Sequence, residues 1–427
     1  MVMVSTRGKD SKNLSDAILN GLASDGGLFI PPSFKKIDFE PYIEIADKEN
    51  AYGIIAKAVL SSFFEGDEIQ DKLESIINKA FDFPCPLKLM NDNKGAYLEL
   101  FYGPTAAFKD FGARFLACSM EAILQKRGGN LTVLVATSGD TGSAVAGAFY
   151  KKEGIKVKIL FPKGGISPRQ KKLLTVWGEN IESYEVDGTF DDCQRMVKEA
   201  FGDSEYRKQY NLTSANSINI ARLLPQMTYY VYSSCLYKKL TGKDPIFIIP
   251  SGNVGNATSA YYAKTIGAPI KQIVLAQNAN RPVVDYLESG IYTPRTSVKT
   301  LANAMDVGAP SNAERMFKLY PSYEEFKNNV SAYSISDEAI IKTIKSTYNT
   351  QNNIICPHTA CAKKVYDDYF NGENAIVVCT AHPAKFEKII YDALGVEVDL
   401  PPFLTKLLSQ KEIYKNIGNN YREIFDE

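Results

Sequence analysis

The sequence has few features that would set it apart from ordinary globular proteins. Its longest apolar runs, such as Leu131 to Ala136, fall far short of the ~20 residues that a membrane-spanning helix needs. The start, MVMVSTRGKDSKNL, lacks the apolar core of a secretory signal, which predicts no export. The 49 basic and 49 acidic side chains cancel, so no net charge attracts nucleic acid or an anionic membrane. We therefore expect no nucleic-acid partner and no membrane partner.

Cysteine and histidine are also scarce. The seven cysteines are odd in number and scattered, which is typical of reduced thiols in a cytoplasmic protein: Cys85, Cys118, Cys193, Cys235, Cys356, Cys361 and Cys379. The two histidines are His358 and His382. The segment CPHTAC around His358 lacks a fourth ligand at a sensible spacing, so we expect no metal site. No nucleophile motif accompanies the histidines, and the chemistry is expected to come from a cofactor.

The middle of the chain shows a regular alternation of strands and helices. The 427 residues are 45% apolar and 23% charged, enough for two or three domains at roughly 100–200 residues each. Apolar, β-branched runs predict buried strands at 131–136, 155–161 and 181–186, with helices between them that begin near Ser143, Pro168 and Asp191. Such short steps indicate parallel strands joined by right-handed crossovers, which is an α/β fold.

The same alternation returns later in the chain. Further strands are predicted at 244–250, 272–278 and 375–379, and the first and last of them are each followed by a loop, SGNVGN or TAHP, and then a helical stretch. We expect two parallel-sheet α/β domains that face each other across a cleft, with the ligand among the loops at the carboxyl ends of the strands. The expected domains are an N-terminal mixed helical domain (1–90), a large α/β domain (91–130 and 206–400), a smaller mobile α/β domain (131–205) and a C-terminal helical tail (401–427).

The loop SGNVGN, from Ser251 to Asn256, joins a predicted strand to a helix. Two glycines allow a tight turn and close backbone approach, and free N–H groups at a helix start attract anions, so a phosphate is the natural guest. The alternative is a plain strand-to-helix turn. The loop is neither a Walker loop nor a dinucleotide fingerprint, so an ATPase or a dehydrogenase has no support.

Two further segments carry candidate functional groups. The loop TSGDTG (137–142) is rich in hydroxyls and could hold a carboxylate or a phosphate, or serve only as a helix cap through Ser138 or Asp140. Lys109 lies between Phe108 and Phe111 at the start of a predicted helix. Apolar rings and a helix N-terminus both disfavour the ammonium form, which suits a Schiff-base lysine. The alternative is a solvated surface lysine, the usual role of lysine on a helix.

In combination, these segments resemble the threonine synthase family, pyridoxal-phosphate enzymes of the tryptophan-synthase-β-like fold (fold type II). The resemblance covers most of the chain, because the motifs follow one another in the order of the family. They are STRG (5–8), GLASDGGLFIP (21–31), GPTAAFKDFGARFLA (103–117), ATSGDTGSA (136–144), FPKGGISPRQ (161–170), SANSINIARLLPQ (214–226), PSGNVGN (250–256), LANAMDVGAPSN (301–312) and TAHPAKF (380–386).

The resemblance implies a role for each matching residue. Lys109 would be the catalytic residue and would carry pyridoxal 5'-phosphate. The cofactor phosphate would lie on the loop formed by Gly252, Asn253, Val254, Gly255 and Asn256. Thr380 would lie against the pyridine nitrogen and leave it largely unprotonated. Asp140 would face the cofactor's 3-oxygen or, with its loop neighbours, the substrate carboxylate. The implied substrate-binding residues are Ser138, Thr141, Lys163, Asn216, Ser217, Asn219 and Arg222.

The implied reaction converts O-phospho-L-homoserine and water to L-threonine and phosphate, by γ-elimination and β-addition of water, as the last step of threonine biosynthesis. The family pattern has a basic residue where this chain has Gly165, and Lys163 or Arg169 would have to replace it. The alternatives are another lyase of the same fold, such as a threonine or serine dehydratase, and a binding protein that has kept the fold without activity. A monomer and a homodimer are both open.

Overall fold

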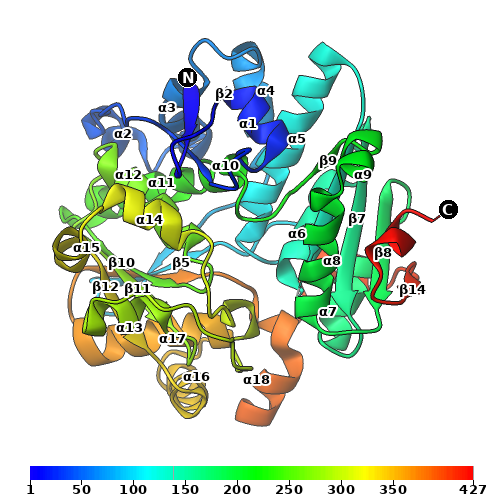
Figure 1. Cartoon of the computed structure of the whole chain (residues 1–427). Helices are drawn as coiled ribbons and strands as arrows, with labels where there is room; N and C mark the ends of the chain where they lie inside the picture. Colours follow the sequence, from blue (N-terminus) through cyan, green and yellow to red (C-terminus); the bar gives the residue numbers. More distant parts are fainter. Residues whose placement is uncertain (138, 427) are drawn as a thin grey trace.

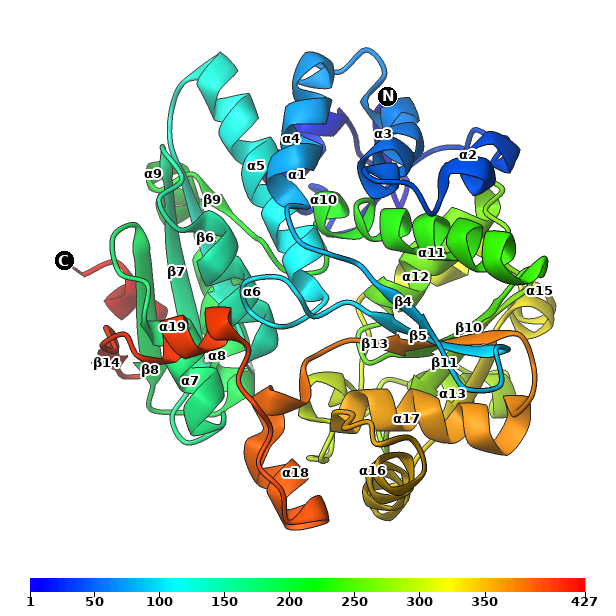
Figure 2. The same cartoon turned by 180° about the vertical axis from the view of Figure 1, so that it is seen from behind.

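The computed structural model describes residues 1–137 and 139–426, which form three β-sheets with helices packed around them (Figures 1 and 2). The N-terminal region is a small antiparallel sheet, ordered β2-β1-β3, beside a group of helices. Its elements are β1 (Val2–Ser5), β2 (Ser11–Asn13), α1 (Leu14–Asn20), β3 (Phe29–Ile30), α2 (Glu40–Ile45), α3 (Ala51–Phe64), η1 (Gln70–Lys72) and α4 (Leu73–Ala80).

The larger sheet has six strands in the order β12-β11-β10-β13-β5-β4. All neighbours are parallel except β4 and β5, and the central strands are buried throughout, which explains their continuous apolar sequences. The strands are β4 (Leu87–Leu89), β5 (Gly95–Glu99), β10 (Ile246–Pro250), β11 (Gln272–Gln277), β12 (Ser331–Ser334) and β13 (Ala375–Cys379). The predicted strands of this half are therefore confirmed.

Helices cover both faces of the larger sheet, as Figure 2 shows for α11 and α12 on one side and α13, α16 and α17 on the other. The helical elements between β9 and the C-terminal segment are α10 (Ile220–Leu223), α11 (Gln226–Thr241), α12 (Gly255–Thr265), α13 (Pro282–Ser289), η2 (Asn303–Met305), α14 (Ala313–Leu319), α15 (Tyr323–Asn329), α16 (Asp337–Gln351), α17 (Pro357–Val365), η3 (Tyr366–Phe370), η4 (Pro383–Phe386) and α18 (Glu387–Leu394).

The smaller sheet is fully parallel, in the order β14-β8-β7-β6-β9. Its elements are β6 (Leu131–Ala136), α6 (Asp140–Phe149), β7 (Ile155–Pro162), α7 (Pro168–Thr175), β8 (Ile181–Val186), α8 (Phe190–Gly202), α9 (Ser204–Gln209), β9 (Leu212–Thr213) and β14 (Lys415–Ile417). The two edge strands lie outside the range 131–205: β9 follows the range directly, and β14 belongs to the C-terminal segment.

The C-terminal segment differs from the helical tail expected from the sequence. It contains α19 (Pro402–Leu408) and η5 (Tyr421–Ile424), but between them β14 pairs with β8 and covers that edge of the smaller sheet. Figure 1 shows the red C-terminal segment beside β8. Helix α6 also differs, because it begins at Asp140 rather than at Ser143 and ends at Phe149.

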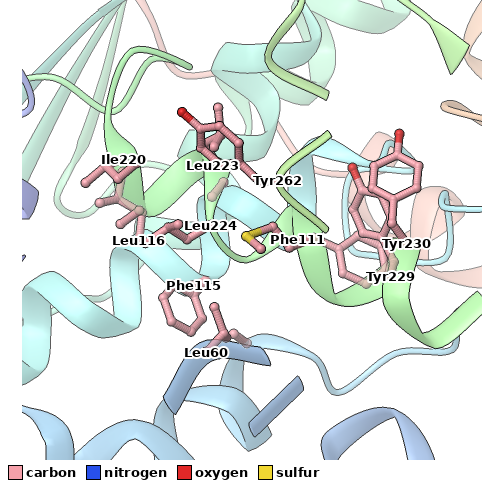
Figure 3. Close-up of a cluster of buried hydrophobic side chains, with 14 of the residues drawn as sticks. Leu60, Phe111, Phe115, Leu116, Ile220, Leu223, Leu224, Tyr229, Tyr230 and Tyr262 are labelled. Carbon is pink, nitrogen blue, oxygen red and sulfur yellow. The ribbon is translucent and has the colours of Figure 1, made fainter. Parts of the chain in front are cut away.

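Helix α5 (Lys109–Arg127) runs through the middle of the molecule, and most of its residues are buried. Its apolar side chains point in several directions, as expected for a helix that is covered on all sides. In Figure 3, Phe111, Phe115 and Leu116 of α5 meet Leu60 of α3 and tyrosines of α11 and α12. Because this core holds α5 from every side, the residue at its N-terminus, Lys109, has a well-defined position.

Candidate active site

A cavity of about 250 Å³ lies where the loops after β6, β10 and β13 meet, at the carboxyl ends of strands from the two parallel sheets. This is the place predicted for the ligand. The residues of the expected site that line it are Lys109, Asp140, Thr141, Asn216, Ser217, Arg222, Gly252, Asn253, Val254, Gly255, Asn256 and Thr380. Ser138, also expected here, lies outside the described residues.

Lys109 is the first residue of α5, and its side chain is 14% exposed. Its Nζ lies 5.2 Å from the centre of the Phe108 ring and 3.8 Å from Asp140 Oδ2. Burial lowers the pKa of Lys109 and outweighs the opposing effect of Asp140. The surface alternative is therefore wrong. Phe111, the other expected ring, points into the core and not toward the amine.

The segment before Lys109 is tied to the strand-end segment that contains Thr380. The N–H of Phe108 donates to Thr380 O (2.9 Å), and Ala107 pairs with Ala381 in an isolated β-bridge. Asp110 accepts hydrogen bonds from the Thr105 hydroxyl (2.6 Å) and N–H (2.9 Å). These contacts bring the Lys109 amine and the Thr380 hydroxyl to the same wall of the cavity.

The loop 251–256 also lines the cavity, and its backbone is closely packed. A Cβ on Gly252 would come within 2.6 Å of Met305 Cα, so only glycine fits there. The left-handed residue of the turn is Val254 (φ 62°) rather than a glycine, although the sequence suggested that the glycines make the turn. A β-branched residue in this conformation is strained by roughly 1–3 kcal/mol, a cost that is typical of ligand-binding turns.

The polar groups of this loop are arranged to receive an anion. Among the described residues, no backbone N–H from Gly252 through Ala257 donates to another protein group. Asn256 Oδ1 accepts from the hydroxyls of Tyr229 and Tyr230 (2.6 Å each), while its buried Nδ2 has no partner among these residues. Asn253 is held by Ser217 Oγ and by the N–H of Ser311. The loop thus leaves donors at a helix start.

Arg222, on α10, is the one buried guanidinium on the cavity wall in the described part of the chain. It approaches α5 closely because Gly112 has no side chain: a Cβ there would lie 2.6 Å from Arg222 O. It donates to Ala215 O (2.5 Å), and its Nε has no protein partner among the described residues. Burial lowers its pKa to about 10, so it stays charged at neutral pH.

The start of α6 contributes Asp140 and Thr141 to the cavity. The N-cap residue of this helix is Gly139, and the Thr137 hydroxyl accepts from the N–H groups of Gly139 (3.0 Å) and Gly142 (2.9 Å). Asp140 is the first helical residue and not the cap. Burial opposes its ionisation, but Lys385 and Lys109 outweigh burial and hold the pKa of its carboxyl well below the usual range. Its negative charge also suits a helix N-terminus.

Three candidates for the substrate phosphate lie away from the cavity. Lys163 is 63% exposed and pairs with Asp187 (3.7 Å) on the outer surface. Asn219 caps α10, accepting from the N–H of Ala221 and donating to Ile18 O. Arg169 donates to Ala384 O and pairs with Glu387 (3.5 Å). In this structure neither Lys163 nor Arg169 lines the cavity, and their role at the position of Gly165 stays a prediction.

Sequence reasoning missed several residues of this site. His358 lines the cavity and accepts from the N–H of Ala304 (3.1 Å); burial lowers its pKa to about 4, so it is neutral. Lys385 is fully buried behind Asp140. Asp306 accepts from Asn278, Asn280 and Thr300 and so holds the loop 301–312. Each lies in or next to a quoted motif, which was the available signal, but pairing across the chain cannot be inferred from local sequence.

A larger open groove, of about 990 Å³, lies in the N-terminal region and is lined by α3, α4 and the segment 81–86. Its walls are mostly aromatic and aliphatic, with charged residues at the rim. The smaller cavity has the convergent polar groups and the shifted pKa values that mark a reaction site. We therefore place the active site in the smaller cavity.

The residues of the cavity fit a bound pyridoxal phosphate. They provide a buried amine with a lowered pKa (Lys109), together with the N–H donors of the turn and the buried amide nitrogen of Asn256, none of which has a partner in the part of the chain that the structure describes. The cations Lys109, Arg222 and Lys385 are matched in number by the carboxylates Asp110, Asp140 and Asp306, so the N–H donors of the turn, and not an excess of positive charge, favour an anionic ligand. The fold and the site define a pyridoxal-phosphate-dependent enzyme of fold type II.

Comparison with known proteins agrees with this class. Residues 96–380 match the family profile described as "Pyridoxal-phosphate dependent enzyme", residues 3–81 match "Threonine synthase N terminus", and residues 359–426 match "Threonine synthase, C-terminal". The chain belongs to the threonine synthase family. The threonine synthase of Haemophilus influenzae is 41% identical over 97% of this chain and 96% of its own, and that of Escherichia coli is 38% identical over 92% and 91%.

Solved structures show the same relationship. The pyridoxal-phosphate-bound threonine synthase from Brucella melitensis superposes with a TM-score of 0.92 at 34% identity, over 99% of this chain and 98% of its own. A threonine deaminase from Solanum lycopersicum gives a TM-score of 0.56 at 16% identity, which shows a shared fold alone. In the part of the chain that the structure describes, none of the helices is both long enough and apolar enough to span a membrane.

Proposed function

We propose that this enzyme converts O-phospho-L-homoserine and water to L-threonine and phosphate. The observation that carries the proposal is the presence of two separate anion-binding sets in one cavity, the loop 252–256 and the group around Arg222. The cofactor's own phosphate needs only one of them. A dehydratase substrate has no phosphate and gives no reason for a second anion site with a buried guanidinium, whereas a phosphorylated substrate does.

The chain's own residues supply binding and proton transfer. Pyridoxal phosphate, when bound, serves as the electron sink for the carbanions that the elimination requires. The loop 252–256 would hold its phosphate, Thr380 would face its ring nitrogen, and Asp140 would face its 3-oxygen. Lys109 would bind its aldehyde and, once freed by the substrate, would move protons at the substrate's Cα and Cβ, because a buried amine with a lowered pKa can both accept and donate a proton.

The substrate would lie between the two anion sites. Arg222, Asn216 and Ser217 are the candidates for its phosphate, since all three line the cavity and Arg222 Nε is a donor without a protein partner among the described residues. Thr141, at the start of α6, is the candidate for its carboxylate. Phosphate would leave from Cγ and water would add at Cβ. The smaller sheet and its helices are proposed to move as one body when the cleft closes.

The direct test measures phosphate release and threonine formation from O-phospho-L-homoserine. Equal amounts of the two products are expected, and 2-oxobutanoate formed from threonine without phosphate release would support a dehydratase instead. Borohydride reduction of the loaded enzyme and peptide mapping should place the pyridoxyl group on Lys109. A label on Lys126 or Lys163 would contradict the assignment. The same sample, analysed by light scattering, separates a monomer from a homodimer.

A cytoplasmic location is also proposed. All seven cysteines are buried and unpaired, as expected for a protein that works in a reducing compartment. Fractionation of cells that express the tagged chain tests this, with the label expected among the cytoplasmic proteins.

A further inference from the structure

Lys385 is a fully buried cation to which neither the sequence motifs nor the proposed reaction assigns a role. It belongs to η4, five residues after Thr380, and its side chain is 0% exposed. Its Nζ lies 2.8 Å from Asp140 Oδ1 and donates to Thr105 O (2.8 Å). Helix α6 follows strand β6 of the smaller sheet, and η4 follows strand β13 of the larger sheet. The ion pair between Asp140 and Lys385 therefore joins the two halves of the molecule at the edge of the cavity.

The two oxygens of Asp140 face different lysines. Oδ1 lies 2.8 Å from Lys385, and Oδ2 lies 3.8 Å from Lys109. Lys385 is not among the residues that line the cavity, so it reaches the reacting groups only through Asp140 and through its charge. Because Lys385 is the closer of the two lysines, its positive charge neutralises most of the negative charge of the Asp140 carboxylate.

The charged or titratable neighbours of Lys109 come from five elements. They are Asp140 on α6, Lys385 on η4, Arg222 on α10, the neutral His358 on α17 and Asp110 on α5 itself. Burial is the main cause of the lowered pKa of Lys109, and the positive charges of Lys385 and Arg222 lower it further. Asp140 alone acts in the opposite direction on this amine.

We propose that Lys385 is a positioning residue for the reaction: it holds the Asp140 carboxylate at the domain junction and neutralises it, so that the Lys109 amine is not locked as an ammonium ion. This inference rests on the proposed function of Lys109 as the reactive amine. Without Lys385, Asp140 would have Lys109 as its nearest cation and would bind it directly. An amine held in that ion pair would accept protons poorly.

The sign of the expected change follows from the charges. Removing a positive neighbour makes the Lys109 nitrogen easier to protonate, whether it is free or joined to the cofactor, so its pKa rises. Freeing Asp140 from its closer partner adds to the effect, because the carboxylate then favours the ammonium form of Lys109. A residue that only filled space would leave this titration unchanged.

The test compares Lys385→Gln, which keeps N–H donors for Thr105 O and Asp140 but removes the charge, with Lys385→Met and Lys385→Arg. The control is Lys388→Gln, a lysine in the adjoining helix α18 that is 83% exposed and whose one ion-pair partner among the described residues is Asp392. The pH dependence of the bound cofactor's visible absorbance is recorded for each loaded enzyme. The reactivity of Lys109 in the cofactor-free full chain is measured against pH by competitive acetylation and mass spectrometry.

We expect the midpoint of the absorbance titration and the midpoint of the acetylation profile to move to higher pH in Lys385→Gln and Lys385→Met. Both midpoints should stay at the wild-type values in Lys385→Arg and Lys388→Gln. The Gln variant should lose kcat on the order of 10- to 100-fold with little change in KM. Unchanged midpoints in the Gln variant, or an equal shift in the Arg variant, would overturn the proposal. If the wild type makes no threonine, the proposed function fails, while the acetylation midpoints still report whether Lys385 controls Lys109.

Discussion

Two buried arginines show the difference between a structural and a functional cation. Arg315 on α14 and Arg222 on α10 are both almost fully buried, and burial lowers the pKa of each to about 10. Arg315 donates to the carbonyls of Phe29, Ser217 and Ile218 and to the Asn312 side chain. Arg222 donates to Ala215 O and leaves its buried Nε without a hydrogen-bond partner among the described residues.

The comparison indicates what to look for in a buried charge. A guanidinium with its donors used by carbonyls stabilises the fold, and here Arg315 fastens the segment 217–218 that forms one wall of the cavity. A guanidinium on a cavity wall with a donor left over has a desolvation cost that only a bound anion can offset. The predictions below test this distinction, beginning with the largest expected effect.

Arg315→Leu should destabilise the protein by about 3–5 kcal/mol, because several buried carbonyls lose their donor at once. The measurement is urea unfolding of the loaded enzyme, with thermal melting as a second reading. A stability loss below about 1 kcal/mol would mean that water or the chain replaces these bonds and that Arg315 is not structural.

Arg222→Ala should lower kcat/KM for O-phospho-L-homoserine by a factor that corresponds to about 2–5 kcal/mol of lost transition-state stabilisation, as expected for loss of a buried, charge-assisted contact. The absorbance spectrum of the cofactor and the melting temperature should change little. If the variant instead turns over the substrate like the wild type but melts at a lower temperature, Arg222 is structural, and its resemblance to Arg315 is closer than the hydrogen bonds suggest.

His358 tests whether a neutral buried group near these cations affects stability. Its pKa is lowered to about 4 from an unfolded value of 6.5, so the unfolded chain binds a proton that the folded chain does not. The part of the unfolding free energy that depends on the neutral ring is fully present above pH 6.5. It decreases by at most about 3 kcal/mol as the pH falls from 6.5 to about 4. His358→Gln should flatten this part of the melting curve against pH; an unchanged slope would contradict the burial effect.

Gly255→Asp tests the second anion site, which is made of backbone and not of guanidinium. A Cβ there would lie 3.0 Å from Asn312 Nδ2, and the added carboxylate would face the cofactor phosphate. Cofactor affinity should fall roughly tenfold, the effect of about 1.4 kcal/mol. Retention of the cofactor on dilution, equal to that of the wild type, would show that the loop is a plain turn.

The local features of the fold could be predicted from the sequence, because their causes are local. Strands such as β6 and β10 are continuous apolar runs bounded by turn residues. The loop SGNVGN directly follows β10 in the sequence, so its place at the carboxyl end of that strand could be predicted without the tertiary structure. Lys109 could be recognised in the motif GPTAAFKDFG, and the structure places it at the start of α5 as expected.

What required the tertiary structure was which distant groups share one cavity. From the sequence, Arg222 and Lys163 are both candidates for the substrate phosphate, and Arg222 is the better one because its fork can bind in a bidentate way. The structure buries Arg222 on the cavity wall, whereas the Lys163 side chain is 63% exposed. Strand β14 has an ordinary polar sequence and forms only because the edge of β8 offers it partners. Lys385 is an ordinary lysine in sequence, and only packing against Asp140 excludes water from it. Periodicity and turn chemistry act within a few residues, whereas burial and charge pairing depend on segments that only the folded chain brings together.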